Sequence, residues 1–105
     1  MEGVKRKMDK VRNYETAIVL RPDLDDDKRE EIIERIKSVI TDNNGEINNI
    51  DEWGNRQLAY EIEDYRTGYY TFINFNSSPD ILDKLEHNYR ILGEIIRSLI
   101  VRKDD

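Results

Sequence analysis

The chain has 105 residues and a mass of 12.5 kDa, which is enough for one hydrophobic core and too little for a two-domain enzyme. Apolar residues make up 37% of it, and the many isoleucines and valines among them favour a folded domain rich in β-structure. The formal net charge is −6, so the molecule repels nucleic acid and anionic membranes at long range. Binding to a polyanion would need a local basic patch or a basic partner. The absence of cysteine excludes disulfides, thiolate metal sites and cysteine nucleophiles.

The N-terminus differs in charge from the rest of the chain. Residues 1–13 carry five cations and two acids without apolar periodicity. They are predicted to form a flexible basic arm, followed by a folded domain over residues 14–103. No apolar run has the length of a membrane span, and the arm lacks the apolar stretch of a secretion signal. The sequence therefore predicts a cytoplasmic protein without a membrane partner.

A strand and a helix are predicted at the start of the domain. Residues 14–21 are rich in β-branched and aromatic side chains and end before Pro22, as is typical of a central strand. Between Asp25 and Asp42 the apolar residues recur every three to four positions, and Asn43-Asn44-Gly45 follows as a stop signal. This spacing predicts a helix with one buried face.

Strands are expected in the middle of the chain. Residues 46–53 show a weak strand pattern with a bulge, and alternation resumes after Gly54-Asn55, with Leu58, Tyr60 and Ile62 on one face. Residues 69–75, rich in aromatic and β-branched residues, predict a further strand.

The last two elements are predicted to be a helix and a strand. Ser77-Ser78-Pro79 is typical of a helix start, with a serine cap and proline at the first helical position. Gly93 ends this segment, and residues 95–102 predict the final strand.

The resulting order is β-α-β-β-α-β. Two right-handed βαβ-like halves, with both helices on one face, give a four-stranded antiparallel sheet of ferredoxin-like topology in the α+β class. No helix is expected to cover the other face of the sheet. Function is therefore expected on this uncovered face.

The sequence contains no residue set typical of catalysis or metal binding. His87 is the only histidine and has no partner base near it in the sequence. The acids from Asp23 to Asp27 have the spacing of a calcium loop, but Lys28 stands where such a loop needs glycine. These carboxylates are expected to stabilise a helix N-terminus instead. The sequence predicts a protein that is not an enzyme and has no metal, cofactor or small-molecule substrate.

The strand from Tyr70 to Phe75 partly matches the aromatic strand of an RNA-recognition motif. Strand alternation places Thr71 and Phe75 towards the core and leaves Tyr70, Phe72 and Asn74 on the uncovered face. Exposed aromatic rings either stack on bases or dock a protein. The acidic charge of the chain favours docking.

Five segments carry a resemblance to a known family: Arg12–Glu15, Ile18–Leu24, Gly54–Ile62, Gly68–Tyr70 and Ile96–Lys103. The most specific element is Gly-x-[Arg/Lys]-x-Leu-Ala-Tyr within the third segment. In these residues the chain resembles the family of bacterial small-subunit ribosomal protein number six, over residues 12–103.

This resemblance implies a ferredoxin-like fold and a structural role in the small ribosomal subunit. It also implies pairing with small-subunit ribosomal protein number eighteen, a basic protein, and binding of the pair to the central domain of the small-subunit rRNA. A basic partner would allow a chain of charge −6 to join a polyanion. The implied rRNA contacts are Arg12, Arg56, Arg97, Arg102 and Lys103. The implied partner side consists of Leu58, Ala59, Tyr60, Tyr70 and Phe72.

Two other functions stay open at this point. One is a freestanding module for single-stranded RNA that stacks bases on Tyr70 and Phe72. The other is a regulatory or small-molecule domain that homodimerises through the uncovered sheet. Strong RNA binding by the isolated chain would indicate the first, and a stable dimer that ignores RNA would indicate the second.

Overall fold

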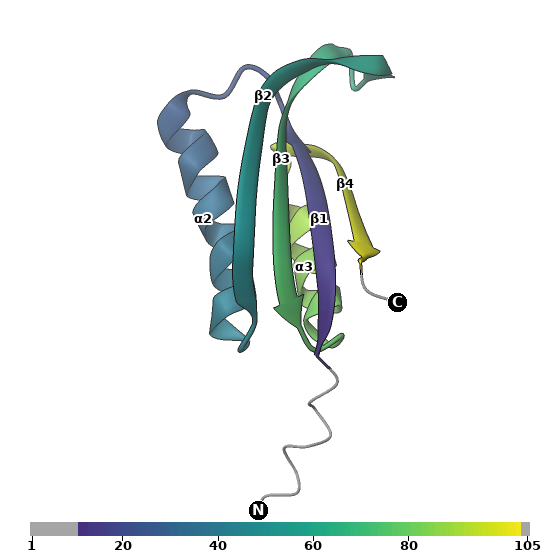
Figure 1. Ribbon diagram of the computed structural model, residues 1–105. Helices are drawn as coiled ribbons and strands as arrows, with labels where there is room; N and C mark the ends of the chain where they lie inside the picture. Colours follow the sequence, from purple (N-terminus) through teal and green to yellow (C-terminus); the bar gives the residue numbers. More distant parts are fainter. Residues whose placement is uncertain (1–10, 104–105) are drawn as a thin grey trace, which may run out of the picture.

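The computed structural model describes residues 11–103 and contains four strands and two helices (Figure 1). The strands lie in the order β2-β3-β1-β4, and each neighbouring pair is antiparallel. Both helices pack on the same face of the sheet. The predicted ferredoxin-like α+β fold is therefore confirmed. The elements are β1 (Arg12–Leu20), α2 (Asp26–Asp42), β2 (Glu46–Ile62), β3 (Tyr65–Ser77), α3 (Ile81–Ile91) and β4 (Ile95–Arg102).

Helix α2 forms where the apolar spacing predicts it. The carboxylate of Asp25 accepts a hydrogen bond of 2.8 Å from the backbone N–H of Lys28, which caps the first turn. At the other end, the backbone N–H of Gly45 donates to the carbonyl of Ile40 at 2.8 Å. The buried stripe of α2 consists of Ile32, Ile33, Ile36 and Ile40.

The core lies between the two helices and one face of the sheet. Alternate residues of β1 and β3, such as Ile18 and Ile73, are fully buried there. They pack with α2 and with Leu85 and Tyr89 of α3. The alternation predicted for the strand from Tyr70 to Phe75 is confirmed, because Thr71 and Phe75 are buried while Tyr70 and Phe72 are only partly covered.

The strand boundaries differ from the predicted ones at the N-terminus. β1 begins at Arg12, so Arg12 and Asn13 belong to the sheet and not to the arm. Both residues are paired in register with β3, opposite Ser77 and Asn76. The rest of the predicted arm, residues 1–10, lies outside the described residues.

β2 is one continuous strand of 17 residues, and the alternation that resumes after Gly54-Asn55 in the sequence belongs to this same strand. Its register against β3 shifts at three places, and Gly54 at φ 83° lies at the second of them. These bulges disturb the period of two on which the sequence pattern depends. β3 is correspondingly longer than predicted and is joined to β2 by Glu63 and Asp64, whose positive φ values suit a two-residue hairpin turn.

Helix α3 begins at Ile81, two residues later than predicted. The carbonyls of Ser78 and Pro79 accept hydrogen bonds from Ile81 and Leu82, at 3.5 and 3.0 Å, in a turn that leads into the helix. Ser77 lies at the end of β3, and its hydroxyl donates to the carbonyl of Ser78 at 2.9 Å. Neither serine therefore caps the helix as expected.

A buried hydroxyl pair joins α3 to the centre of the sheet. The hydroxyls of Tyr89 and Thr16 lie 2.7 Å apart, and the Thr16 hydroxyl also lies 3.2 Å from the carbonyl of Leu99. Burial raises the pKa of Tyr89 far above its ordinary value near 10. The folded protein thus holds the phenol proton more tightly than the unfolded chain does.

We expect the contribution of Tyr89 to stability to be complete below about pH 10 and to be lost as the pH rises above it. In that range this group should lower the free energy of unfolding by about 1.4 kcal/mol per pH unit. Urea denaturation at a series of pH values between 8 and 11 would measure the slope. Tyr89→Phe should flatten it, and an unchanged slope in that variant would contradict the assignment.

Candidate docking face of the sheet

The uncovered face of the sheet contains a groove of about 320 Å³. It forms because the end of the β2–β3 hairpin curls over the face towards β1 and β4 (Figure 1). All five residues predicted to form the partner side line this groove. Its lining consists of Ala17, Val19, Leu58, Ala59, Tyr60, Ile62, Tyr70, Phe72, Arg97, Ser98 and Leu99.

Close packing at Gly68 lets the hairpin approach β1. A Cβ atom on Gly68 would lie 2.3 Å from Cγ1 of Val19, so a larger residue would push the hairpin away. Val19 and Leu58 are buried although they lie on the side of the sheet away from the helices. Tyr60 and Leu99 are each 60% exposed above them. The floor of the groove is therefore buried, whereas its apolar rim is exposed to solvent.

A side-chain contact between the two outer strands, β2 and β4, bounds the groove on one side. Nη1 of Arg97 in β4 lies 2.6 Å from the hydroxyl of Tyr60 in β2 and donates to it. The Arg97 guanidinium also lies 5.4 Å from the centre of the Tyr60 ring. β2 and β4 are the outer strands of the sheet, so this pair spans its uncovered face. Arg97, which was expected to contact rRNA, therefore lies on the groove.

A row of aromatic rings extends from the groove along the same face. The ring of Phe72 lies 4.6 Å from that of Trp53 and 6.4 Å from that of Tyr70. Arg56 stands 5.7 Å from the Trp53 ring, and the indole N–H donates to the carboxylate of Asp51 at 3.0 Å. Trp53 was not predicted to be a site residue, because the bulges of β2 hide its face in the sequence pattern.

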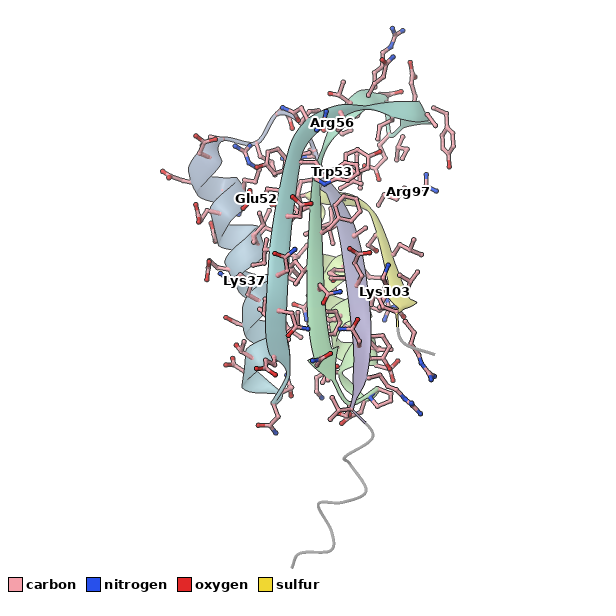
Figure 2. All side chains as sticks on the ribbon, viewed as in Figure 1. Lys37, Glu52, Trp53, Arg56, Arg97 and Lys103 are labelled. Carbon is pink, nitrogen blue, oxygen red and sulfur yellow. The ribbon has the colours of Figure 1, made fainter. Side chains whose placement is uncertain are left out.

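The five cations predicted to contact rRNA are not gathered in one patch. Lys103 lies beside the start of β1, where its backbone N–H donates to the carbonyl of Asn13 at 2.7 Å. Arg12 and Arg102 lie at the same end of the sheet, whereas Arg56 lies near the opposite end and Arg97 between them (Figure 2). The structure therefore divides these residues into three places.

Neither a metal site nor a membrane-spanning helix is found among the residues that the structure describes. Residues 11–103 contain no group of three or more histidine or acidic side chains that could hold a metal ion. None of the helices within these residues is long and apolar enough to cross a membrane. The face presents apolar surface, aromatic rings and charged side chains of both signs.

Known proteins are similar to this chain in both sequence and fold. The profile of the family "Ribosomal protein S6" matches residues 13–102. Over 95 residues the chain is 52% identical to small ribosomal subunit protein bS6 of Caldanaerobacter subterraneus subsp. tengcongensis and 46% identical to that of Thermoanaerobacter pseudethanolicus, with 90% of this chain and 100% of each relative covered. The crystal structure of 30S ribosomal protein S6 from Thermotoga maritima matches with a TM-score of 0.85 and 36% identity, covering 90% of this chain and 89% of that one. Fold and relatives thus define a protein of the small ribosomal subunit. The chain belongs to the ribosomal protein S6 family.

Family membership confirms several predictions made from the sequence. The resemblance itself is confirmed over nearly the whole described chain. Members of this family are structural proteins of the small ribosomal subunit, not enzymes, and the bacterial subunit is a cytoplasmic particle. The individual residues predicted to bind rRNA or a partner stay predictions.

Proposed function

We propose that this chain binds the central domain of the small-subunit rRNA as a heterodimer with small-subunit ribosomal protein number eighteen, a basic protein. The groove is the observation that carries the proposal. It gathers the five predicted partner-side residues, which come from two segments of the sequence (residues 58–60 and 70–72), into one apolar recess. An apolar recess with exposed large side chains on its rim is typical of a protein interface.

Charge supports a basic partner for this face. The chain as a whole carries −6, and Glu61 and Glu63 are exposed on the hairpin that overhangs the groove. Glu61 is paired at 3.1 Å with Arg66, whereas Glu63 and Asp64 form the turn itself. A cationic protein docked here would meet complementary charge at the rim and would bring the positive surface that rRNA requires.

Filter retention of a central-domain rRNA fragment tests the proposal. The full chain would be measured alone, with protein number eighteen, and protein number eighteen alone, over a series of salt concentrations. We expect tight retention only for the pair, with a steep salt dependence that comes mainly from the partner's cations. Equally tight retention by this chain alone would refute the proposal.

The aromatic row supports a second candidate, a freestanding module for single-stranded RNA. Trp53 is half exposed, Phe72 lies against it, and Arg56 stands nearby, as in stacking platforms. Against this candidate, the carboxylate of Asp51 accepts a hydrogen bond from the indole N–H of Trp53. Its negative charge would repel a phosphate backbone that passed beside the ring. Base-dependent retention of oligonucleotides by the isolated chain, lost in Trp53→Ala, would favour this candidate.

A further inference from the structure

Three side chains on the helix side of the sheet connect α2 to β2. The guanidinium carbon of Arg29 in α2 lies 4.1 Å from the centre of the Tyr69 ring in β3. The Tyr69 hydroxyl donates a hydrogen bond of 2.6 Å to Oε1 of Glu52 in β2. This hydrogen bond raises the pKa of Tyr69, so the phenol keeps the proton that it donates. We call Arg29, Glu52 and Tyr69 the helix-side clamp.

The clamp is held firmly at its α2 end. The Arg29 side chain is only 18% exposed and pairs with Asp26. It also donates to the carbonyl of Leu24 at 3.3 Å. The Tyr69 ring packs between this guanidinium and the hydrophobic core. The hydroxyl of Tyr69 therefore projects from a well-packed ring and can hold the exposed side chain of Glu52 in one place.

Glu52 is the last paired residue of β2 before a β-bulge. In register it lies opposite Thr71. The next pair is Gly54 with Tyr70, so Trp53 is the extra residue of the bulge. Because successive side chains of a strand point to opposite faces, holding Glu52 on the helix side directs Trp53 to the uncovered face. A slip of this part of β2 by one residue would exchange the faces of Glu52 and Trp53.

Trp53 extends the docking surface beyond the groove. Its side chain is half exposed, and its ring lies 4.6 Å from that of Phe72, which lines the groove. An exposed aromatic side chain beside an apolar recess is typical of the residues that contribute most to protein interfaces. The carboxylate of Asp51 accepts the indole N–H at 3.0 Å and places negative charge beside the ring. This charge favours a basic protein as the occupant.

We propose that Trp53 is an anchor for the basic partner and that Glu52 and Tyr69 are positioning residues for it. They act from the opposite face of the sheet, by holding the bulge that presents the indole to the partner. Arg29 contributes by fixing the Tyr69 ring. The binding step of this inference rests on the proposed function, whereas the positioning of Trp53 can be measured on the chain alone.

The first test follows the indole N–H resonance of Trp53, the only tryptophan of the chain, by NMR of the labelled full chain. Tyr69→Phe removes the hydroxyl and keeps the ring beside Arg29. We expect the indole resonance to shift or broaden, because the bulge is no longer held in one arrangement. Glu52→Ala should change it in the same way. An indole resonance that is identical in Tyr69→Phe and in the wild type would refute the positioning role.

Glu34→Ala is the matched control for Glu52→Ala. Glu34 is an exposed glutamate of α2 whose carboxylate lies 3.0 Å from the ammonium of Lys37. Both variants remove one carboxylate and one side-chain contact, so they alter the net charge equally. Glu34→Ala should leave the indole resonance and the affinity for the partner unchanged. A loss of affinity equal to that of Glu52→Ala would assign the effect to net charge and contradict the inference.

The second test is a double-mutant cycle on binding of the full chain to protein number eighteen, measured by calorimetry. Tyr69→Phe should weaken binding about three- to tenfold. In the background of Trp53→Ala the same substitution should change the affinity by less than about twofold, because a positioning residue acts only through the residue that it positions. Equal losses in the two backgrounds would show that Tyr69 does not act through Trp53, and the inference would be wrong.

The outcomes separate this inference from the proposed function. If the wild type binds protein number eighteen and Trp53→Ala binds it equally well, Trp53 is not an anchor and the proposed function stands. If the wild type does not bind this partner, the proposed function and the anchor role both fail. In that case the indole resonance of Tyr69→Phe still decides whether the helix-side clamp positions Trp53.

Discussion

Leu99→Asn is expected to weaken binding of the basic partner by about 10- to 100-fold without unfolding the chain. Leu99 lines the groove and is 60% exposed, so the free protein loses little packing. In the complex, the variant would lose apolar contact and bury an amide without a partner, which costs about 1–3 kcal/mol. Asparagine is neutral, so attraction to a basic protein cannot offset the loss. Isothermal titration calorimetry of the two proteins would measure it.

The matched control for Leu99→Asn is Ile91→Asn. Ile91 is 54% exposed at the end of α3 and does not line the groove. This variant should bind the partner with wild-type affinity. If Ile91→Asn weakens binding and Leu99→Asn does not, the partner docks on the helical face and the proposed interface is wrong.

Phe75→Ala should lower the free energy of unfolding by about 3–5 kcal/mol, as is typical for large core aromatics. Phe75 is completely buried, and its ring lies 5.6 Å from that of Tyr14. Because a domain of this size has a stability of about 5–15 kcal/mol, the loss is a large share of the total. Urea denaturation at neutral pH would measure it.

The comparison for Phe75→Ala is Phe72→Ala, three residues earlier on the same strand. Phe72 is only partly covered and faces away from the helices, so its loss should cost clearly less stability than that of Phe75. The same variant should weaken partner binding, because Phe72 lines the groove. Equal destabilisation by the two variants would show that the uncovered face is itself a second core, which contradicts its assignment as a docking surface.

Local patterns sufficed for α2 and for the order of the elements. The apolar spacing between Asp25 and Asp42 matches a helix with one buried stripe, and α2 forms over almost the same range. The alternation from Tyr70 to Phe75 also predicted correctly which side chains face the core. In both cases, the residues that determine the structure lie within a few positions of one another.

β2 could not be predicted in the same way. Its three register shifts depend on how it meets β3, and each shift changes the face to which the following side chains point. The exposure of Trp53 beside Phe72 is one result. The curl of the hairpin over the sheet, which brings Tyr60 to Arg97, is another. Pairing between residues distant in sequence decides both features.

The candidate site was predicted unevenly for the same reason. The resemblance to the family indicated five apolar or aromatic residues that do line one groove. It also suggested five cations, which lie in three separate places. The helix-side clamp of Arg29, Glu52 and Tyr69 was not foreseen, because it appears only when the register of β2 against β3 is known.

Methyl NMR of the labelled chain with unlabelled protein number eighteen tests the central claim most directly. The methyl groups of Val19, Leu58 and Leu99 in the groove should shift or broaden on binding. Those of Ile33 in α2 and Ile91 at the end of α3 should keep their positions. Changes confined to the two helices, with the groove methyls unmoved, would contradict the account.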